Sequence, residues 1–216
     1  MINTASTRSA ELIKLYDFDL SGHCHKVRLF LSLLDIPYEK INVDLPNGEH
    51  KSNFFLKLNS FGQVPVIQDG DLTIADSNAI LVYLALKYDS LALWLPAKPI
   101  IQAKIQRWLS AAAGPLAFGI ANLRAARVFK RTVDSRAQEL SDRLLASMNF
   151  ELSKSNFLCS DQHPTIADIA MYSYIAHSPE GGINLGQYEN IQAWISKIEL
   201  LPRFQGMKKS PHHDAS

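Results

Sequence analysis

Hydrophobic and polar residues change their spacing twice near the start of the chain. They alternate over residues 12–18 and again over residues 38–43, which is the period of a half-buried β-strand. Between these stretches, over residues 23–35, apolar residues recur at i, i+3, i+4 and i+7, the spacing of an amphipathic helix. The pattern predicts a β-α-β unit whose two strands pair most simply in parallel.

The pattern continues in the same style to about residue 89. Residues 49–58 predict a short helix, and two apolar runs at 64–68 and 72–74 flank an Asp-Gly turn, which predicts a β-hairpin. Residues 76–88 carry a strong helical pattern. The order of these elements predicts a small α/β domain over residues 12–89.

The rest of the chain predicts helices and no strands. Residues 90–99 hold two prolines and predict a linker to an all-α domain over residues 100–207. Gly114-Pro115 falls inside the first helix and predicts a kink, because proline has no N–H and its ring clashes with the preceding turn. The predicted helices cover residues 100–129, 135–152, 165–177 and 192–201. We expect residues 1–11 to be a disordered tail and residues 208–216 to be frayed.

Composition and charge exclude several classes of function. The chain is 47% hydrophobic and 20% charged, as soluble globular proteins are, and its net charge of +1 gives no case for nucleic acid or an anionic membrane. No apolar run reaches the length of a membrane span, about 18 residues. We interpret the densest basic cluster as a solvated helix end, where cations are favoured; it contains Arg124, Arg127, Lys130 and Arg131.

The cysteine content points to a reducing compartment. Cys24 and Cys159 are too few for the disulfide framework of a secreted domain, and they lack the spacing of zinc ligands, so we expect no metal. The polar first eleven residues carry no apolar stretch of a signal peptide. We therefore expect a cytoplasmic protein.

The turn before the first helix is a candidate site for thiol chemistry. Ser21 stands at the helix start, where unpaired N–H groups and a partial positive charge stabilise a thiolate. Its hydroxyl can donate a hydrogen bond to such a sulfur, or Ser21 can serve only as an N-cap. Cys24 is either a nucleophile of depressed pKa or, as its place on the shoulder of the apolar face favours, a packed inert thiol.

Three further segments have both a structural and a functional interpretation. Pro65 cannot donate to a strand ladder, so it is either a trans proline at a strand start or a cis proline beside an open edge, where Val64 would pair with an extended peptide. Asp76 and Ser77 open a helix and either cap it or also hold a carboxylate. Thr165 and Asp168 have the spacing of a capping box, and we interpret that pair as structural; Asp168 replaces the usual Glu or Gln.

Together these segments resemble the glutathione transferase superfamily from residue 12 to about residue 204. The segment Asn59-Ser60-Phe61-Gly62-Gln63-Val64-Pro65-Val66 is similar to the one before the family's cis-proline, Asp76-Ser77 to its acidic-serine pair, and Thr165-Ile166-Ala167-Asp168 to its capping element. The Ser21 segment is similar to bacterial-type, theta- and zeta-like members with a serine in the active site. The resemblance implies a thioredoxin-like domain followed by a helical domain.

The resemblance also implies ligands and roles. Glutathione would be the co-substrate, Ser21 would activate its sulfur, and Cys24 is the weaker alternative. His50, with Lys51 beside it, would contact the glycine carboxylate of glutathione, and Val64 would pair with its cysteinyl backbone. The family implies a homodimer. The implied glutathione-binding residues are His50, Lys51, Gln63, Val64, Pro65, Asp76 and Ser77.

The second substrate is expected to be a small apolar electrophile between the domains. Leu20 and one side of the long helix, where Ser110, Gly114 and Phe118 fall at i, i+4 and i+8, would form its wall, unless Phe118 belongs to the core. Conjugation of such an electrophile, or reduction of an organic hydroperoxide, is the first functional hypothesis. A thiol-disulfide oxidoreductase using Cys24 and a non-catalytic binding module are the alternatives.

Overall fold

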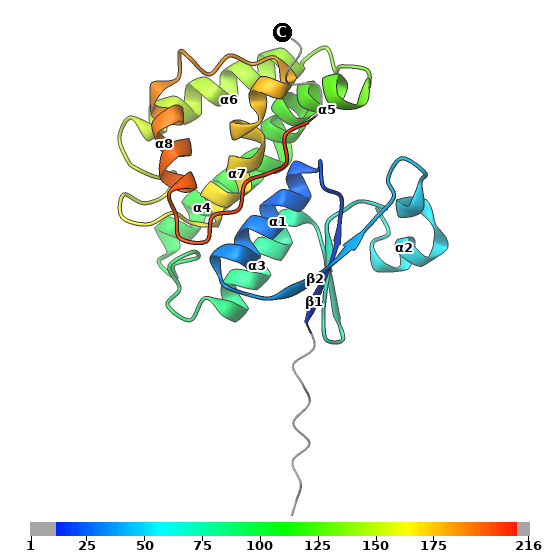
Figure 1. Ribbon diagram of the computed structural model, residues 1–216. Helices are drawn as coiled ribbons and strands as arrows, with labels where there is room; N and C mark the ends of the chain where they lie inside the picture. Colours follow the sequence, from blue (N-terminus) through cyan, green and yellow to red (C-terminus); the bar gives the residue numbers. More distant parts are fainter. Residues whose placement is uncertain (1–11, 211–216) are drawn as a thin grey trace, which may run out of the picture.

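A four-stranded mixed sheet forms the centre of the N-terminal domain (Figure 1). Strands β1 (Ile13–Asp17) and β2 (Tyr38–Asn42) pair in parallel, as predicted. Strand β3 (Val66–Asp69) pairs antiparallel with β1 on its other side, and β4 (Leu72–Ala75) closes the hairpin. The sheet order is β2-β1-β3-β4. The computed structural model describes residues 12–210.

The alternation of β1 places its side chains on two different cores. Leu15 joins the large core that includes α1 (Gly22–Leu33) and α3 (Ser77–Tyr88). Tyr16 points to the opposite face and packs in a smaller core with Phe55 of α2 (Asn53–Leu58). This separation follows from the two-residue period of a strand.

Two predicted elements have different bounds in the structure. The predicted helix over 49–58 divides into a 3₁₀ turn, η1 (Glu49–Lys51), and α2 (Asn53–Leu58), because Ser52 adopts an extended backbone and caps α2. Strand β3 begins at Val66, two residues after the expected start at 64. Pro65 has no N–H to contribute to the ladder, which explains the later start.

The second domain is helical, and its first long helix is interrupted as predicted. Gly114 has φ −103° and ψ −105°, which no α-helix tolerates, and the chain forms wide π-type turns around Pro115. The predicted continuous helix over 100–129 is therefore three segments. The elements are α4 (Pro99–Ala111), η2 (Ala112–Ile120), α5 (Ala121–Phe129), α6 (Ala137–Leu152), α7 (Ile166–Ala176), η3 (Ser178–Gly181) and α8 (Glu189–Glu199).

Helix α7 joins the two domains. It is buried along nearly all of its length, and it packs against α1 of the first domain and α4 of the second. Its start is held by the predicted capping box of Thr165 and Asp168, and the N–H of Ile166 donates to the Trp94 carbonyl in the linker at 2.9 Å. No helix within residues 12–210 is long and apolar enough to cross a membrane.

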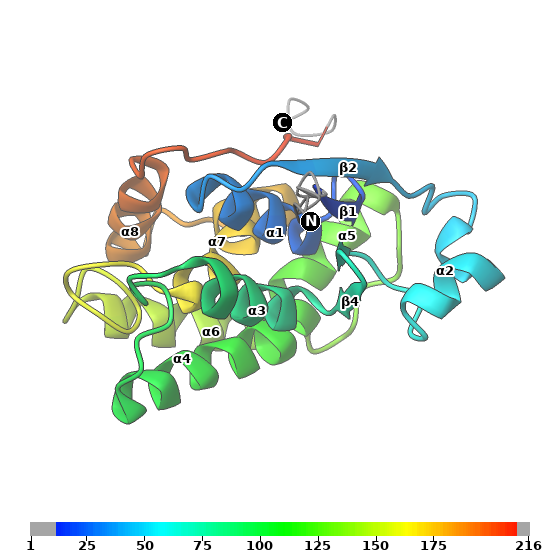
Figure 2. The ribbon, with the colours of Figure 1, turned by 90° about the horizontal axis from the view of Figure 1, so that it is seen from below.

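After α8 the chain returns to the first domain and runs along α1 (red in Figures 1 and 2). His25 Nε2 donates to the Gln205 carbonyl at 2.8 Å, and Ser32 Oγ donates to the Arg203 carbonyl at 2.7 Å. We expected residues 208–210 to be frayed. Ser210 is instead buried, whereas Lys208 and Lys209 are exposed. The remaining predicted tail residues, 1–11 and 211–216, lie outside the described residues.

Candidate functional site

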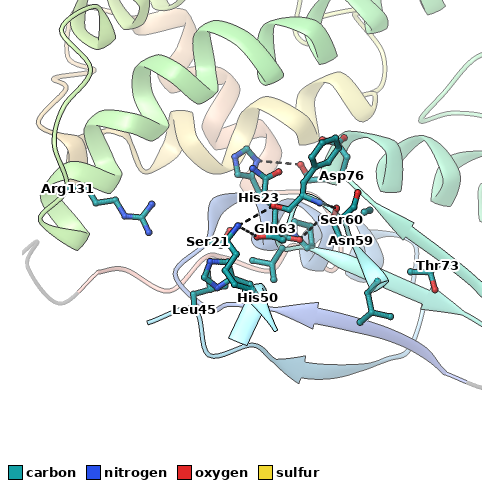
Figure 3. Close-up of a pocket in the computed structure, with 18 residues that line it drawn as sticks. Ser21, His23, Leu45, His50, Asn59, Ser60, Gln63, Thr73, Asp76 and Arg131 are labelled. Carbon is teal, nitrogen blue, oxygen red and sulfur yellow. Dashed lines mark hydrogen bonds between the residues drawn. The ribbon is translucent and has the colours of Figure 1, made fainter. Parts of the chain in front are cut away.

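A cavity of about 800 Å³ lies where the N-terminal domain faces the end of α5 (Figure 3). It brings together most of the binding residues that the sequence singled out, from separate turns of the N-terminal domain. Those residues are Ser21, His50, Lys51, Gln63, Val64, Pro65, Asp76 and Ser77. The cavity also contains His23, Asn59 and Arg131, which the predicted binding set omitted.

Ser21 is the N-cap of α1, and this role leaves its hydroxyl proton free to act. Its backbone is extended, and its Oγ accepts a hydrogen bond from the Cys24 N–H at 3.3 Å. A hydroxyl has two acceptor lone pairs and one donor proton. Capping uses one lone pair, so the same hydroxyl can also donate to an anion in the cavity. The two interpretations of Ser21 are therefore compatible.

Cys24 is fully buried and is not among the residues that line the cavity. Burial, with the nearby Asp17 charge, raises the pKa of its thiol to about 12. A thiol that stays protonated and has no access to solvent is a poor nucleophile. The structure thus favours the packed, inert interpretation of Cys24.

Oxidised glutathione is expected to leave Cys24 of the folded protein unmodified, because its sulfur is both protonated and enclosed. Mass spectrometry of the intact and digested protein checks this. The same treatment in denaturant serves as the control and should label both Cys24 and Cys159, which are free thiols. A glutathione adduct on Cys24 under native conditions would restore the oxidoreductase hypothesis.

The Val64–Pro65 peptide bond is cis, and it lies just before strand β3. The ladder of β3 begins at Val66, which pairs with Tyr16 on one side and Ala75 on the other, so the sheet does not use the backbone groups of Val64. Asn59 holds the preceding turn, since its Nδ2 donates to the Gln63 carbonyl at 2.8 Å. Val64 therefore presents backbone groups to the cavity from a fixed turn.

Asp76 and Ser77 occupy the N-terminus of α3. Asp76 Oδ1 accepts hydrogen bonds from the N–H groups of Asn78 and Ala79, both at 2.9 Å. Asp76 has φ 74°, a value that costs a non-glycine residue energy and that occurs preferentially at functional sites. Ser77 Oγ lies 3.4 Å from His23 Nδ1, and burial lowers the pKa of His23 to about 3, so this imidazole is neutral. The arrangement offers helix N–H groups and a hydroxyl to an anion.

The opposite end of the cavity is cationic. Lys51 Nζ donates to the carbonyls of Phe61 and Gly62, at 3.3 and 3.2 Å, which fixes the ammonium group beside the turn. His50 Nδ1 is buried and has no hydrogen-bond partner within residues 12–210. Burial lowers the pKa of His50, and the positive charges of the nearby Lys51 and Arg131 lower this pKa further. These groups fit a carboxylate.

A second cavity, of about 410 Å³, adjoins the first and shares Ser21, Leu45 and Arg131 with it. Its wall is mostly apolar and comes from the loops after β1 and β2, from α5 along its whole length and from Tyr174 of α7. The other lining residues are Phe18, Leu20, Pro46, Ala121, Arg124, Ala125, Phe129 and Tyr174.

The predicted wall of this cavity needs correction. Leu20 lies in it, but Ser110, Gly114 and Phe118 line neither cavity. The prediction assumed one regular helix, and the wide turns of η2 change the direction of every later side chain. Phe118 is consequently 57% exposed, which also excludes the core position considered for it. The wall is instead formed one segment later, by α5.

The surroundings of the basic residues near the end of α5 also differ from the prediction. We interpreted Arg124 and Arg131 as parts of a solvated cluster, yet Arg124 is buried and Arg131 lines both cavities. The sequence shows four cations close together, but no local pattern indicates which of them is buried or lines a cavity. Residues 12–210 contain no group of three or more side chains arranged to hold a metal ion.

Known proteins match this chain over both domains. Residues 11–86 match the model of the glutathione S-transferase N-terminal domain, and residues 97–202 match that of the C-terminal domain. Glutathione S-transferase 3 of Zea mays is 30% identical over 207 residues, which cover 89% of this chain and 91% of the maize protein.

Solved structures show the same similarity. A glutathione S-transferase from Pseudomonas fluorescens is 31% identical with a TM-score of 0.84, and the match covers 91% of this chain and 99% of that one. A glutathione transferase homolog from Drosophila mojavensis, solved with bound glutathione, is 27% identical with a TM-score of 0.80 and covers 88% of this chain and 89% of its own. The chain belongs to the glutathione S-transferase family.

Proposed function

We propose that the larger cavity binds glutathione and that Ser21 activates its thiol for attack on an electrophile held in the smaller cavity. The observation that carries this proposal is the position of Ser21, which lines both cavities. A sulfur beside the Ser21 hydroxyl is therefore in reach of a substrate in the second cavity. Members of this family transfer glutathione, and each residue around the two cavities would contribute one part of that reaction.

Glutathione has the shape and charges that the larger cavity requires. It is a short extended peptide with a carboxylate at each end and a thiol between them. Its cysteinyl backbone would pair with Val64, and its γ-glutamyl end would lie at the N-terminus of α3, at Asp76 and Ser77. Its glycyl carboxylate would contact Lys51 and His50, while Gln63 approaches the same end.

The reaction at the sulfur needs a stabilised thiolate. Ser21 would donate a hydrogen bond to the sulfur, and the N-terminus of α1 would add its partial positive charge. The thiol proton leaves to solvent, the sulfur forms a bond to the electrophilic carbon, and the bond from that carbon to its leaving group breaks. With an aryl chloride the leaving group is chloride. Lowering the thiol pKa by one or two units raises the thiolate fraction at neutral pH by about ten- to a hundredfold.

Substitutions at Ser21 separate its capping role from its donor role. Ser21→Ala removes both, whereas Ser21→Asp keeps a cap acceptor and offers no proton to the sulfur. Both variants are expected to raise the pKa of the bound thiol by about one to two units and to lower kcat/KM at neutral pH by about ten- to a hundredfold. The measurements are the ultraviolet absorbance of the thiolate against pH and turnover of an aryl chloride.

Ser21→Thr is the matched control, because threonine supplies both the acceptor and the donor. It should retain a thiol pKa close to that of the wild type. An unchanged thiol pKa in Ser21→Ala would show that Ser21 is a cap only and that another group activates the sulfur.

Two features of the surroundings complete the proposal. Cys24 and Cys159 are both free, which fits the reducing conditions of the cytoplasm.

We also expect a homodimer formed through α3 and α4. Leu86 of α3 is 71% exposed and Ile100 of α4 is 66% exposed, and covering these apolar side chains would favour association.

A further inference from the structure

The four basic residues around the end of α5 differ in their surroundings. Arg124 is buried, whereas Arg127, Lys130 and Arg131 are exposed. Of these three exposed residues, Arg131 lines both cavities and the other two line neither. The side chain of Arg131 extends from the helical domain toward the cavity, on the side where Ser21 and His50 lie (Figure 3). Its guanidinium also lies over the Phe129 ring, 5.7 Å from the ring centroid. Arg131 thus places a cation where the two cavities meet.

Arg131 is the unpaired charge of the smaller cavity. The other cation in the lining, Arg124, is already neutralised, since its Nε donates to Glu180 Oε2 at 2.9 Å and its Nη1 donates to the Leu20 carbonyl at 2.8 Å. Arg131 forms no ion pair with any described residue, and no acidic residue is among those described that line this cavity. An apolar chamber with one free guanidinium at its edge favours a ligand that is apolar but carries a negative charge.

We propose that the second substrate is an apolar electrophile with an anionic group, such as a carboxylate, which Arg131 binds. This inference rests on the proposed function and names the substrate class of the same site. The glycyl carboxylate of glutathione already has Lys51 and His50, both from the N-terminal domain. Arg131 instead belongs to the segment whose neighbours Ala121, Ala125 and Phe129 form the wall of the smaller cavity.

A matched pair of aryl chlorides tests the charge preference directly. 4-Chloro-3-nitrobenzoate and 4-chloro-3-nitrobenzamide have nearly the same shape and leaving group, and only the first is an anion. In each, the glutathione sulfur bonds to the carbon that carries chlorine, and chloride departs. The measured quantity is the ratio of kcat/KM for the benzoate to that for the benzamide, in the wild type and in two variants that lose the same charge.

Arg131→Gln is expected to lower this ratio by about tenfold, because a charge-assisted hydrogen bond to the carboxylate is lost. Lys130→Gln is the control, since Lys130 lines neither cavity, and it should leave the ratio unchanged. Added salt should lower the wild-type ratio, because an exposed ion pair is screened. Arg131→Lys should keep part of the preference.

Two results would overturn the inference, and they can be distinguished. If both compounds are turned over but Arg131→Gln leaves the ratio within about twofold of the wild type, the inference alone fails. A raised KM for glutathione with an unchanged ratio would then assign Arg131 to the glycyl carboxylate. If the wild type binds no glutathione and turns over neither compound, the proposed function fails and this inference falls with it.

Discussion

Asp168→Ala is expected to lower the free energy of unfolding by about 3–5 kcal/mol. The carboxylate is fully buried and accepts four hydrogen bonds, from Leu158 N and Trp194 Nε1 at 2.9 Å, Thr165 N at 2.8 Å and Thr165 Oγ1 at 3.2 Å. Alanine would leave these buried donors without a partner, and each such donor costs about 1–3 kcal/mol. Because the donors come from the loop before α7, from its N-cap and from α8, the whole helical domain should weaken.

Denaturant unfolding followed by circular dichroism measures this effect. Asp168→Asn keeps the size of the side chain and one acceptor oxygen, so it should cost less than alanine. Thr165→Ala removes only the hydroxyl cap and should cost about 1 kcal/mol. A loss in Asp168→Ala no larger than that in Thr165→Ala would show that the buried network contributes little beyond the cap.

Arg124→Met is expected to cost about 3–5 kcal/mol and also to lower catalysis. The guanidinium is 2% exposed and pairs with Glu180, so the variant leaves a buried carboxylate without its charge partner. It also frees the Leu20 carbonyl, which immediately precedes Ser21. Since the role proposed for Ser21 requires its hydroxyl to lie within hydrogen-bond reach of the sulfur, kcat/KM should fall by about tenfold or more.

Two controls separate the charge from the packing. Arg127→Met, at an exposed position of the same helix, should change stability by less than about 0.5 kcal/mol. The double variant Arg124→Met with Glu180→Gln removes both charges and should recover part of the lost stability, measured as a coupling energy. Strictly additive effects would contradict a direct interaction between Arg124 and Glu180.

Acid should diminish the effect of Arg124→Met. Burial by itself would raise the pKa of Glu180, but the hydrogen bond to His177 and the charge of Arg124 bring it down to about 2, below its ordinary value of 4.5. A depressed pKa stabilises the fold above 4.5, and this stability is lost as the pH falls toward 2. The difference in unfolding free energy between wild type and variant should therefore shrink over that interval.

The order of elements was predictable because local spacing reports local structure. The two-residue period of β1 and β2 and the helical period of α1 each depend on which face is buried, and that information lies within a few neighbouring residues. The bounds were less predictable. Ser52 divides one expected helix, and Pro65 delays β3, since in both cases a single backbone group decides where hydrogen bonding starts.

The larger cavity was also largely predictable from sequence. Ser21 and Ser77 stand at helix starts and Val64 stands beside a proline, so each was marked by its own backbone position before any tertiary contact was known. His23 and Arg131 carried no such mark. His23 lies one residue before Cys24 in an ordinary first turn, and only the packing of α7 and α3 around it makes it part of the cavity.

The sequence by itself determined the two-domain order, the kink at Gly114 and the residues at the starts of α1, α3 and α7, because periodicity, proline and helix caps act over a few residues. Only the tertiary structure decided the second cavity. The wide turns of η2 turn Phe118 outward and bring α5 to the wall. Arg124 is held at that wall by its hydrogen bond to the distant Leu20 carbonyl, and Arg131 follows the end of α5 into the lining. The direction of a side chain after an irregular turn depends on everything that packs against it, which no local pattern records.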